Sequence, residues 1–202
     1  DAQESRGLGD VYKRQVTSVG IAISMYMGLR IGEVCALQWK EIDLEKRVLT
    51  VSKTIQRVQC RTGSKQTKLI ITEPKSESSK RTIPIPDCLL PLLRRFKDNG
   101  EVYVVSGRKK PVEPRTMQYR FAKILHNADL PSFHYHSLRH LFATRCVELG
   151  FDVKTLSEIL GHSSVEVTLN RYIHSDMERK RTCMSLLSKC CLFYTSPSPR
   201  DS

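Results

Sequence analysis

The sequence predicts an α+β fold that is mainly helical, with a small antiparallel β-sheet at one edge of the domain. Three runs rich in β-branched residues predict the strands of this sheet: Arg47–Val51, Lys68–Thr72 and Arg81–Pro86. From Ser137 onward the pattern is helical. A chain of 202 residues is long enough for one domain with a real core, but too short for two large ones.

Four helices are expected before Ser137. The first ends at Gly28, because glycine readily takes the left-handed conformation that stops a helix. In chain order the predicted helices are Val16–Met27, Arg30–Leu37, Leu89–Lys97 and Thr116–Asn127. Val102–Val105 is expected to add a short strand, and the polar stretch Glu73–Lys80 to form the tip of a hairpin between the strands that flank it.

The last third of the chain carries signals for the ends of helices. Asp152 can cap a helix that runs to Leu160, where Gly161 stops it. The segments SSVE (163–166) and SDME (175–178) both have the pattern of a capping box, which starts a helix. His162 therefore precedes one helix, and Tyr172 falls between that helix and the next.

Composition and charge restrict the classes of partner. The formal net charge is +12 and the pI about 9.5, which attracts polyanions, and nucleic acid is the commonest of them. No apolar run approaches the ~20 residues that span a bilayer, so no membrane partner is expected. The seven cysteines are scattered without a C-x-x-C pair, which favours reduced, buried thiols in a cytosolic protein over disulfides or zinc.

The two ends of the chain are related to each other at the level of DNA. One coding sequence for Arg6–Gln15, read on the opposite strand, encodes Cys191–Arg200 except at Phe193. We therefore expect residues 1–15 and 190–202 to be translated sequencing adapter, and residues 16–189 to be the native domain. Acidic and basic residues balance in both ends, so the net charge of +12 lies in residues 16–189.

The stretch HYHSLRH (134–140) contains the first candidate for chemistry. His136 and Arg139 lie three apart at the start of a predicted helix, hence on one face. A helix start attracts anions, and an arginine adds a fork that binds a phosphate with two donors. The alternative is a zinc pair of His136 and His140, but no cysteine or glutamate nearby supplies an obvious third ligand.

Three further polar residues precede this stretch. Arg30 directly follows the predicted helix stop, and Glu33 either forms a helical ion pair or holds a neighbouring cation in place. Lys75 lies in the expected hairpin tip, where a solvated loop lysine is the ordinary interpretation. Each of these features is common in proteins that bind nothing specific.

Taken together, four stretches resemble the tyrosine recombinases, or phage integrases, in their catalytic domain. They are GLRIGEVCALQW (28–39), EPKSESSKRTIPIP (73–86), HSLRHLFATR (136–145) and LGHSSVEVTLNRYIH (160–174). Their order and separations match the active-site motifs of that family, and the similarity extends over Val16–Leu187. The resemblance implies the catalytic-domain fold of this family, in an integrase of the conjugative-transposon or prophage type.

The resemblance also implies roles for residues that bind and protonate the DNA. Arg30 and Arg139 match the two arginines that hold the scissile phosphate. Lys75 matches the hairpin lysine that protonates the departing 5′ oxygen, although the choice between it and Lys80 depends on register, and Lys75 is favoured because it follows TEP. Glu33 matches an acidic residue that supports the site from behind.

The remaining roles concern the nucleophile and its neighbours. By the same resemblance Tyr172 is the nucleophile, and His136 is the first histidine of the site and the best placed proton acceptor for the tyrosine hydroxyl. His162 fills a position where the family has histidine or tryptophan.

The implied activity is site-specific cleavage and rejoining of DNA through a 3′-phosphotyrosine, for integration or excision of a mobile element. The implied partners are double-stranded DNA and further copies of the chain in a synaptic tetramer, in the bacterial cytoplasm at the nucleoid, with no cofactor or metal. Alternatives are a type IB topoisomerase, which shares the chemistry, and a non-catalytic DNA-binding relative. The latter would have lost Arg30, Arg139 or Tyr172, and all three are present.

Full-length members of the family carry an N-terminal DNA-binding domain before this one. We therefore expect the chain to be a fragment that cleaves DNA weakly without that domain. Residues 176–187 (DMERKRTCMSLL) are expected to form a helix that either docks on a neighbouring protomer or simply ends the domain.

Overall fold

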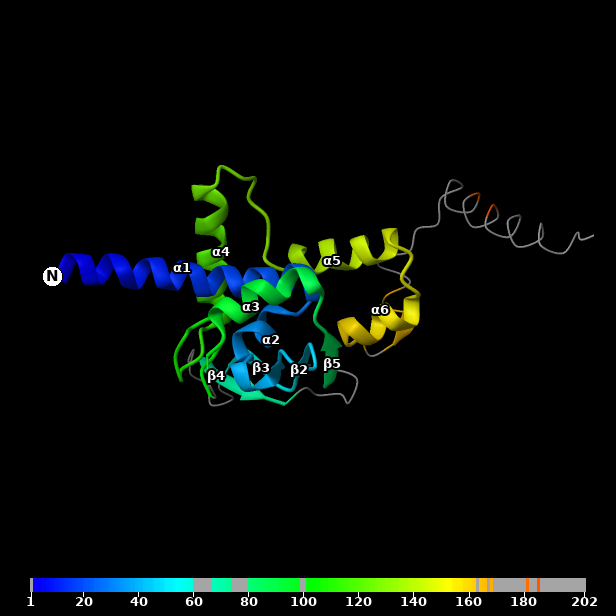
Figure 1. Ribbon diagram of the computed structural model, residues 1–202, viewed down its shortest axis with the longest axis horizontal. Coiled ribbons are helices and arrows are strands. Elements are labelled where there is room, and N and C mark those ends of the chain that lie inside the picture. Colours follow the sequence, from blue (N-terminus) through cyan, green and yellow to red (C-terminus); the bar gives the residue numbers. More distant parts are fainter. Residues whose placement is uncertain are drawn as a thin grey trace, which may run out of the picture.

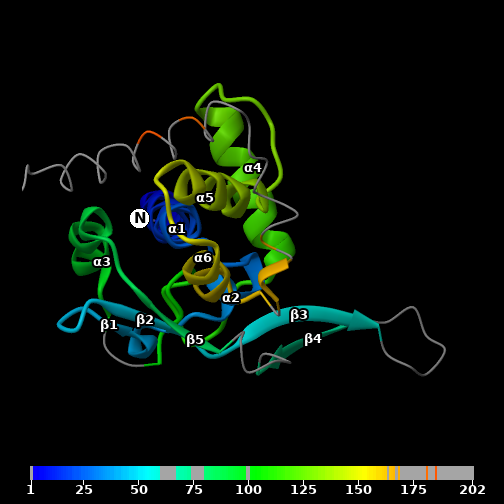
Figure 2. The ribbon, with the colours of Figure 1, turned by 90° about the vertical axis from the view of Figure 1, so that its right-hand side faces the viewer.

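The computed structural model describes residues 2–59, 67–73, 80–98, 101–162, 164–166, 168, 181 and 185, with side chains from Arg14 onward. A long helix, α1 (Ala2–Met27), runs through the centre of the domain, and its N-terminal part extends away from the body (Figure 1). Figure 2 looks along α1 and shows the other helices arranged around it. No helix in the described part of the chain is long and apolar enough to cross a membrane.

The buried face of α1 explains its central position. Val16, Val19, Ile23 and Met27 follow one another at steps of three or four residues and are at most 3% exposed. The helix expected at Val16–Met27 is confirmed, and α1 begins earlier, at Ala2. It ends at Gly28, whose φ of 68° is the left-handed conformation expected there.

The other helices also follow the predicted pattern, with small shifts at their ends. They are α2 (Ile31–Ala36), α3 (Leu90–Phe96), α4 (Pro114–Asn127), α5 (Ser137–Glu148) and α6 (Val153–Leu160). Short 3-10 turns, η1 (Trp39–Glu41) and η3 (Asp87–Leu89), join them to the strands. The side chain of Asp152 caps α6 by accepting a hydrogen bond from the Thr155 amide at 2.9 Å, as expected.

The strands form two antiparallel sheets, where one was expected. In the first, β2 (Val48–Val51) lies between β1 (Ile42–Asp43) and β5 (Arg81–Pro84). In the second, β3 (Thr54–Gln59) pairs with β4 (Thr67–Thr72).

The expected hairpin between Lys68–Thr72 and Arg81–Pro86 is therefore wrong. β3 follows β2 after two residues, but the two strands pair with different strands. Val51 at the end of β2 lies opposite Arg81 of β5, and Thr54 at the start of β3 lies opposite Thr72 of β4. Glu73–Lys80 consequently connects β4 of one sheet to β5 of the other, and does not join two paired strands.

The strand expected at Val102–Val105 is also wrong. Only Tyr103 forms bridges, one to Gln38 and one to Arg108, and the chain turns immediately afterwards. Val104 and Val105 are fully buried, so their apolar character reflects packing against the core and not a place in a sheet. The turn includes Gly107, which has a φ of 60°.

The core consists of one large cluster around α1 and a smaller one between α5 and α6. The smaller cluster contains Ala143, Cys146, Val147, Leu156 and Leu160. Burial raises the pKa of the Cys146 thiol to about 11 and that of Cys35 to about 12, in keeping with the expected buried thiols. Cys88 is exposed and departs from that expectation.

Gly20 provides a test of the packing around α1. A Cβ at this position would lie 2.3 Å from Val105 Cγ1, so the helix and the turn after Tyr103 are in direct contact. Alanine in an exposed helix is more stable than glycine by about 1 kcal/mol. We expect the opposite sign for Gly20→Ala, a loss of roughly 1–3 kcal/mol in the free energy of unfolding, because the side chain overpacks the core.

The measurement is urea denaturation of Gly20→Ala beside Ser18→Ala, which changes an exposed position of the same helix. Ser18→Ala should shift the free energy of unfolding by no more than about 0.5 kcal/mol. A Gly20→Ala protein as stable as the parent would show that α1 does not pack against Val105 as described.

Candidate active site

Three arginines from separate parts of the chain meet at the C-terminal end of α6. Arg81 Nε donates to the carbonyl of Ile159 at 2.6 Å, and Arg139 Nη2 donates to that of Leu160 at 2.7 Å. Arg30 Nη2 donates to the carbonyl of Gly161 at 3.1 Å. These arginines lie at the start of β5, in the first turn of α5 and just before α2, respectively. Figure 2 shows α6 lying beside these elements.

The end of a helix suits this arrangement. Its last carbonyls have no partner within the helix and carry the negative end of the helix dipole. Gly161 has a φ of 64°, and two bonds close the helix: the Gly161 amide donates to Glu158, and the His162 amide donates to Ser157. Backbone amides thus donate to the carbonyls of residues 157 and 158, while arginine side chains donate to the carbonyls of residues 159–161.

Glu33 holds two of the arginines in place. Its Oε1 accepts from Arg30 Nη1 at 2.9 Å and from Arg81 Nη1 at 3.1 Å. Its Oε2 accepts from the Arg30 amide at 2.8 Å and from Arg81 Nη2 at 3.0 Å. Both interpretations of Glu33 from the sequence are therefore observed, since it forms a helical ion pair with Arg30 and binds a second cation.

The charge of Glu33 depends on these partners. Its side chain is 5% exposed, and burial alone would raise the pKa of the carboxyl. The hydrogen bonds and positive charge of Arg81, with a smaller effect from Arg30, outweigh burial and lower the pKa below its usual value. Glu33 is consequently ionised at neutral pH, and it gives the arginines a fixed counter-charge.

The two arginines predicted to bind phosphate differ in how deeply they are buried. The side chain of Arg30 is 38% exposed, whereas Arg139 is 2% exposed and also donates to the Gly28 carbonyl at 2.8 Å. Because they donate to adjacent carbonyls of one turn, the structure brings them together as the motifs predict. His136 is the N-cap residue of α5 and is exposed, with its ring 4.6 Å from that of His140.

His162 follows Gly161 directly, so the same helix end sets its position. Its Nδ1 lies 2.7 Å from Oγ1 of Thr168, which is fully buried. Lys75 and Tyr172 lie outside the described residues. Lys80, the alternative lysine, is exposed and immediately precedes β5.

Arg81 and Thr168 are functional-site candidates that the sequence motifs did not predict. The stretch RTIPIP (81–86) predicts only a strand. Its one charged residue, Arg81, begins an otherwise apolar strand, and this is a signal that could have indicated a buried ion pair. The side chain of Arg81 is 7% exposed. In the described ranges no group of three His, Cys, Asp or Glu residues could hold a metal ion.

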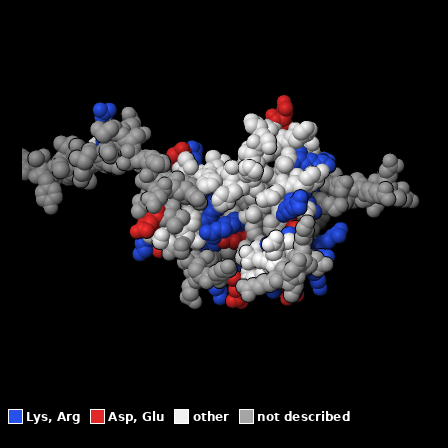
Figure 3. Space-filling model, turned by 180° about the vertical axis from the view of Figure 1, so that it is seen from behind, with Lys and Arg blue, Asp and Glu red and all other residues white. Residues whose placement is uncertain are grey.

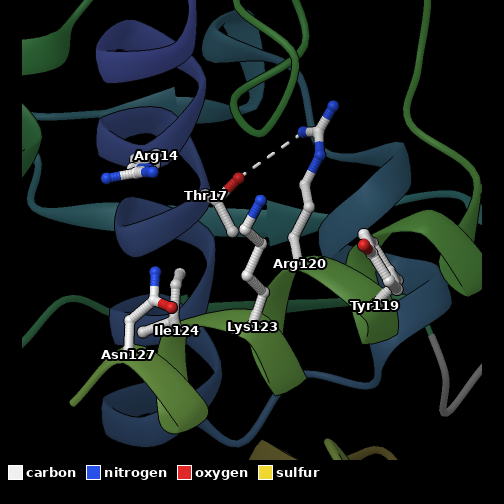
Figure 4. Close-up of a pocket in the computed structure, with 7 residues that line it drawn as sticks. All are labelled: Arg14, Thr17, Tyr119, Arg120, Lys123, Ile124 and Asn127. Atoms are coloured by element: carbon white, nitrogen blue, oxygen red, sulfur yellow. Dashed lines mark hydrogen bonds between the residues drawn. The ribbon is translucent and has the colours of Figure 1, made fainter.

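A second basic feature lies between α1 and α4. Its small pocket is lined by Arg14, Thr17, Tyr119, Arg120, Lys123, Ile124 and Asn127, and Figure 4 shows the lining side chains. Arg120 Nη1 lies 3.5 Å from Thr17 Oγ1, and burial lowers the pKa of this arginine. The pocket shares no lining residue with the arginine cluster at α6. Elsewhere, basic side chains lie at several separate places on the surface (Figure 3).

The Glu33 carboxylate provides a test of the arginine cluster. Glu33→Gln should lower the free energy of unfolding by roughly 3 kcal/mol at pH 7, because it removes the charge from a buried ion pair. The pKa of Glu33 is lowered in the folded state, so its contribution is present above the unfolded pKa and is lost as pH falls through the folded pKa. The gap between parent and variant should therefore narrow below about pH 4.5, the unperturbed value.

Urea denaturation at pH 7, 5, 4 and 3 measures this gap. Glu148→Gln is the matched control, because its ion pair with Arg145 is exposed on both sides and should contribute less than about 1 kcal/mol. A gap for Glu33→Gln that stays constant with pH would contradict the assignment of an ionised, arginine-bound carboxylate.

Solved structures with the same fold are known. The Tn1549 transposon integrase, in complex with transposon right end DNA, matches with a TM-score of 0.65 and 29% sequence identity. The match covers 84% of this chain and 58% of that one. The XerA recombinase matches with a TM-score of 0.57 at 20% identity, over 87% of this chain and 62% of its own, which supports the fold alone. The predicted fold class is thereby confirmed.

Curated relatives carry related names. A XerC-like tyrosine recombinase of Caldanaerobacter subterraneus is 33% identical over 180 residues, or 80% of this chain and 46% of that protein. The ICEBs1 integrase of Bacillus subtilis is 28% identical over 165 residues, or 75% of this chain and 43% of its own length. The chain spans about half the length of the curated relatives that it matches.

The family model described as the phage integrase family matches residues 9–179. This range contains all four motifs and the three arginines at the end of α6. The chain therefore belongs to the phage integrase family, that is, to the tyrosine recombinases.

Proposed function

We propose that the chain is the catalytic part of a site-specific recombinase, which cleaves and rejoins DNA through a 3′-phosphotyrosine. One observation carries the proposal: Arg30 and Arg139 donate to adjacent carbonyls at the end of α6, directly before His162. Two guanidiniums brought together in this way form a site for a phosphate group.

The chemistry explains why arginines are needed. Attack on a phosphodiester builds negative charge on the non-bridging oxygens of the phosphorus. Fixed guanidinium donors stabilise that charge and can do the electrostatic work that a metal ion does in other phosphoryl-transfer enzymes. Arg30 reaches the surface while Glu33 anchors it from behind, so its guanidinium is held in position before the DNA arrives.

The remaining steps use residues assigned through the family motifs. The Tyr172 hydroxyl attacks the phosphorus, and His136 accepts its proton. The bond from phosphorus to the 5′ oxygen breaks, and Lys75 protonates that oxygen as it leaves. The 3′-phosphotyrosine keeps the energy of the phosphodiester, so the 5′ hydroxyl of another strand can reverse the reaction and release Tyr172.

The partners follow from the same comparison. Double-stranded DNA is proposed because the net charge is +12 and the Tn1549 integrase structures contain transposon DNA. Four copies of the chain in a synaptic complex, in the bacterial cytoplasm, would provide the strands to be exchanged. Relatives named as integrases of ICEBs1 and of a prophage favour a mobile element as the substrate, and recombination over the relaxation that a topoisomerase performs.

Covalent trapping tests the proposal. The substrate is a nicked duplex with the end sequence of the mobile element, from which the cleaved fragment diffuses away so that the 3′-phosphotyrosine cannot reverse. The parent protein, assayed at full length with the N-terminal DNA-binding domain expected from the family, should form an adduct that survives SDS, and Tyr172→Phe in the same full-length protein should form none. Arg30→Ala should still bind DNA in a mobility-shift assay, but form the adduct about 10²- to 10³-fold more slowly.

Tyr119→Phe serves as the matched control, because it removes the hydroxyl of an exposed tyrosine on α4. This variant should form the adduct as the parent does. An adduct of unchanged yield in Tyr172→Phe would assign the nucleophile to another residue. If the parent gives no adduct on this DNA, the proposed function is wrong.

A further inference from the structure

We propose that Arg81 is a positioning residue for strand cleavage, which fixes Arg30 through Glu33 and fastens the start of β5 to the end of α6. The inference rests on the proposed function, because it assigns Arg81 to the placement of a phosphate-binding group. Arg81 itself is directed inward, with its side chain 7% exposed.

The contacts of Arg81 define a fixed geometry. Its Nη1 and Nη2 donate to the two oxygens of Glu33 at 3.1 and 3.0 Å, a paired arrangement that only a guanidinium can make. Its Nε donates to the carbonyl of Ile159 at 2.6 Å. The planar group therefore joins α2 and α6 through three bonds, and cannot turn without breaking at least one of them.

Glu33 transmits this geometry to Arg30. Each oxygen of the carboxylate accepts one bond from Arg81 and one from Arg30. If Arg81 is removed, Glu33 keeps only its bonds to Arg30 and loses the contacts that orient it against α6. Arg30 is 38% exposed, so its guanidinium depends on this carboxylate and on the Gly161 carbonyl for its position.

Arg81 also anchors the segment that carries the candidate lysines. It is the first residue of β5, lies opposite Val51 in the sheet and directly follows Lys80. The segment Glu73–Lys80 therefore joins β5 at the residue that binds Glu33. One side chain thus links the strand that follows the candidate lysines to Glu33 and, through Glu33, to Arg30.

The test compares two substrates in the trapping assay. One is the nicked duplex described above, and the other carries a methylphosphonate at the scissile position. The methylphosphonate is neutral, so attack on it builds less negative charge and depends less on a well placed guanidinium. Arg30→Ala serves as the reference variant, because the factor by which it slows adduct formation should be much smaller on the methylphosphonate than on the phosphodiester.

Arg81→Ala should follow the pattern of Arg30→Ala. We expect a fall of about 10- to 100-fold in the rate of adduct formation on the phosphodiester, and of at most about 3-fold on the methylphosphonate. Arg81→Lys keeps the charge but not the paired geometry, and should lie between the parent and Arg81→Ala. Arg145→Ala, which removes an exposed arginine paired with Glu148, should match the parent on both substrates.

An equal loss for Arg81→Ala on both substrates would overturn the inference, because it would show a general structural effect. Unchanged rates would overturn it as well. If thermal unfolding shows that Arg81→Ala does not fold, Arg81→Lys is compared on the two substrates, and an equal loss there has the same meaning. A parent protein without a Tyr172-dependent adduct would instead refute the proposed function.

Discussion

The C-terminal end of α6 is the point on which the site depends. Three consecutive carbonyls there accept hydrogen bonds from three arginines that come from a strand, a helix and a loop. Positive charges repel one another, and acceptors placed among them offset that repulsion. The negative end of the helix dipole supplies such acceptors without adding a full charge. The arginines are therefore brought together by backbone carbonyls, and a shift of α6 would disturb a hydrogen bond of each of the three guanidiniums.

The balance of charge at this point also has a functional meaning. Glu33 pairs with both Arg30 and Arg81, and one carboxylate balances only one of these two positive charges. A second carboxylate would neutralise the cluster and weaken its attraction for a phosphate. The backbone carbonyls stabilise the arginines without neutralising their positive charge. A group that stabilises negative charge in a transition state must keep such a positive charge.

Local signals in the sequence predicted much of this arrangement, and non-local ones did not. Gly28, Gly161 and the cap at Asp152 mark helix ends by residue type alone, so these boundaries could be predicted. The pairing of β5 with β2 joins strands that are far apart in the sequence, with β3 and β4 between them, and no single stretch encodes it. Arg81 was missed for the same reason, because its partners on α2 and α6 are far away in the sequence.

Gly28 shows how a residue behind the arginine cluster can determine the geometry of that cluster. Its carbonyl accepts from Arg139, and a Cβ at this position would lie 2.4 Å from the Phe142 ring and 3.0 Å from Leu160. Its φ of 68° adds a second demand for glycine. A substitution at position 28 would therefore disturb the packing behind Arg139, and a loss of the proposed activity in such a variant would not by itself place Gly28 on a DNA-binding surface.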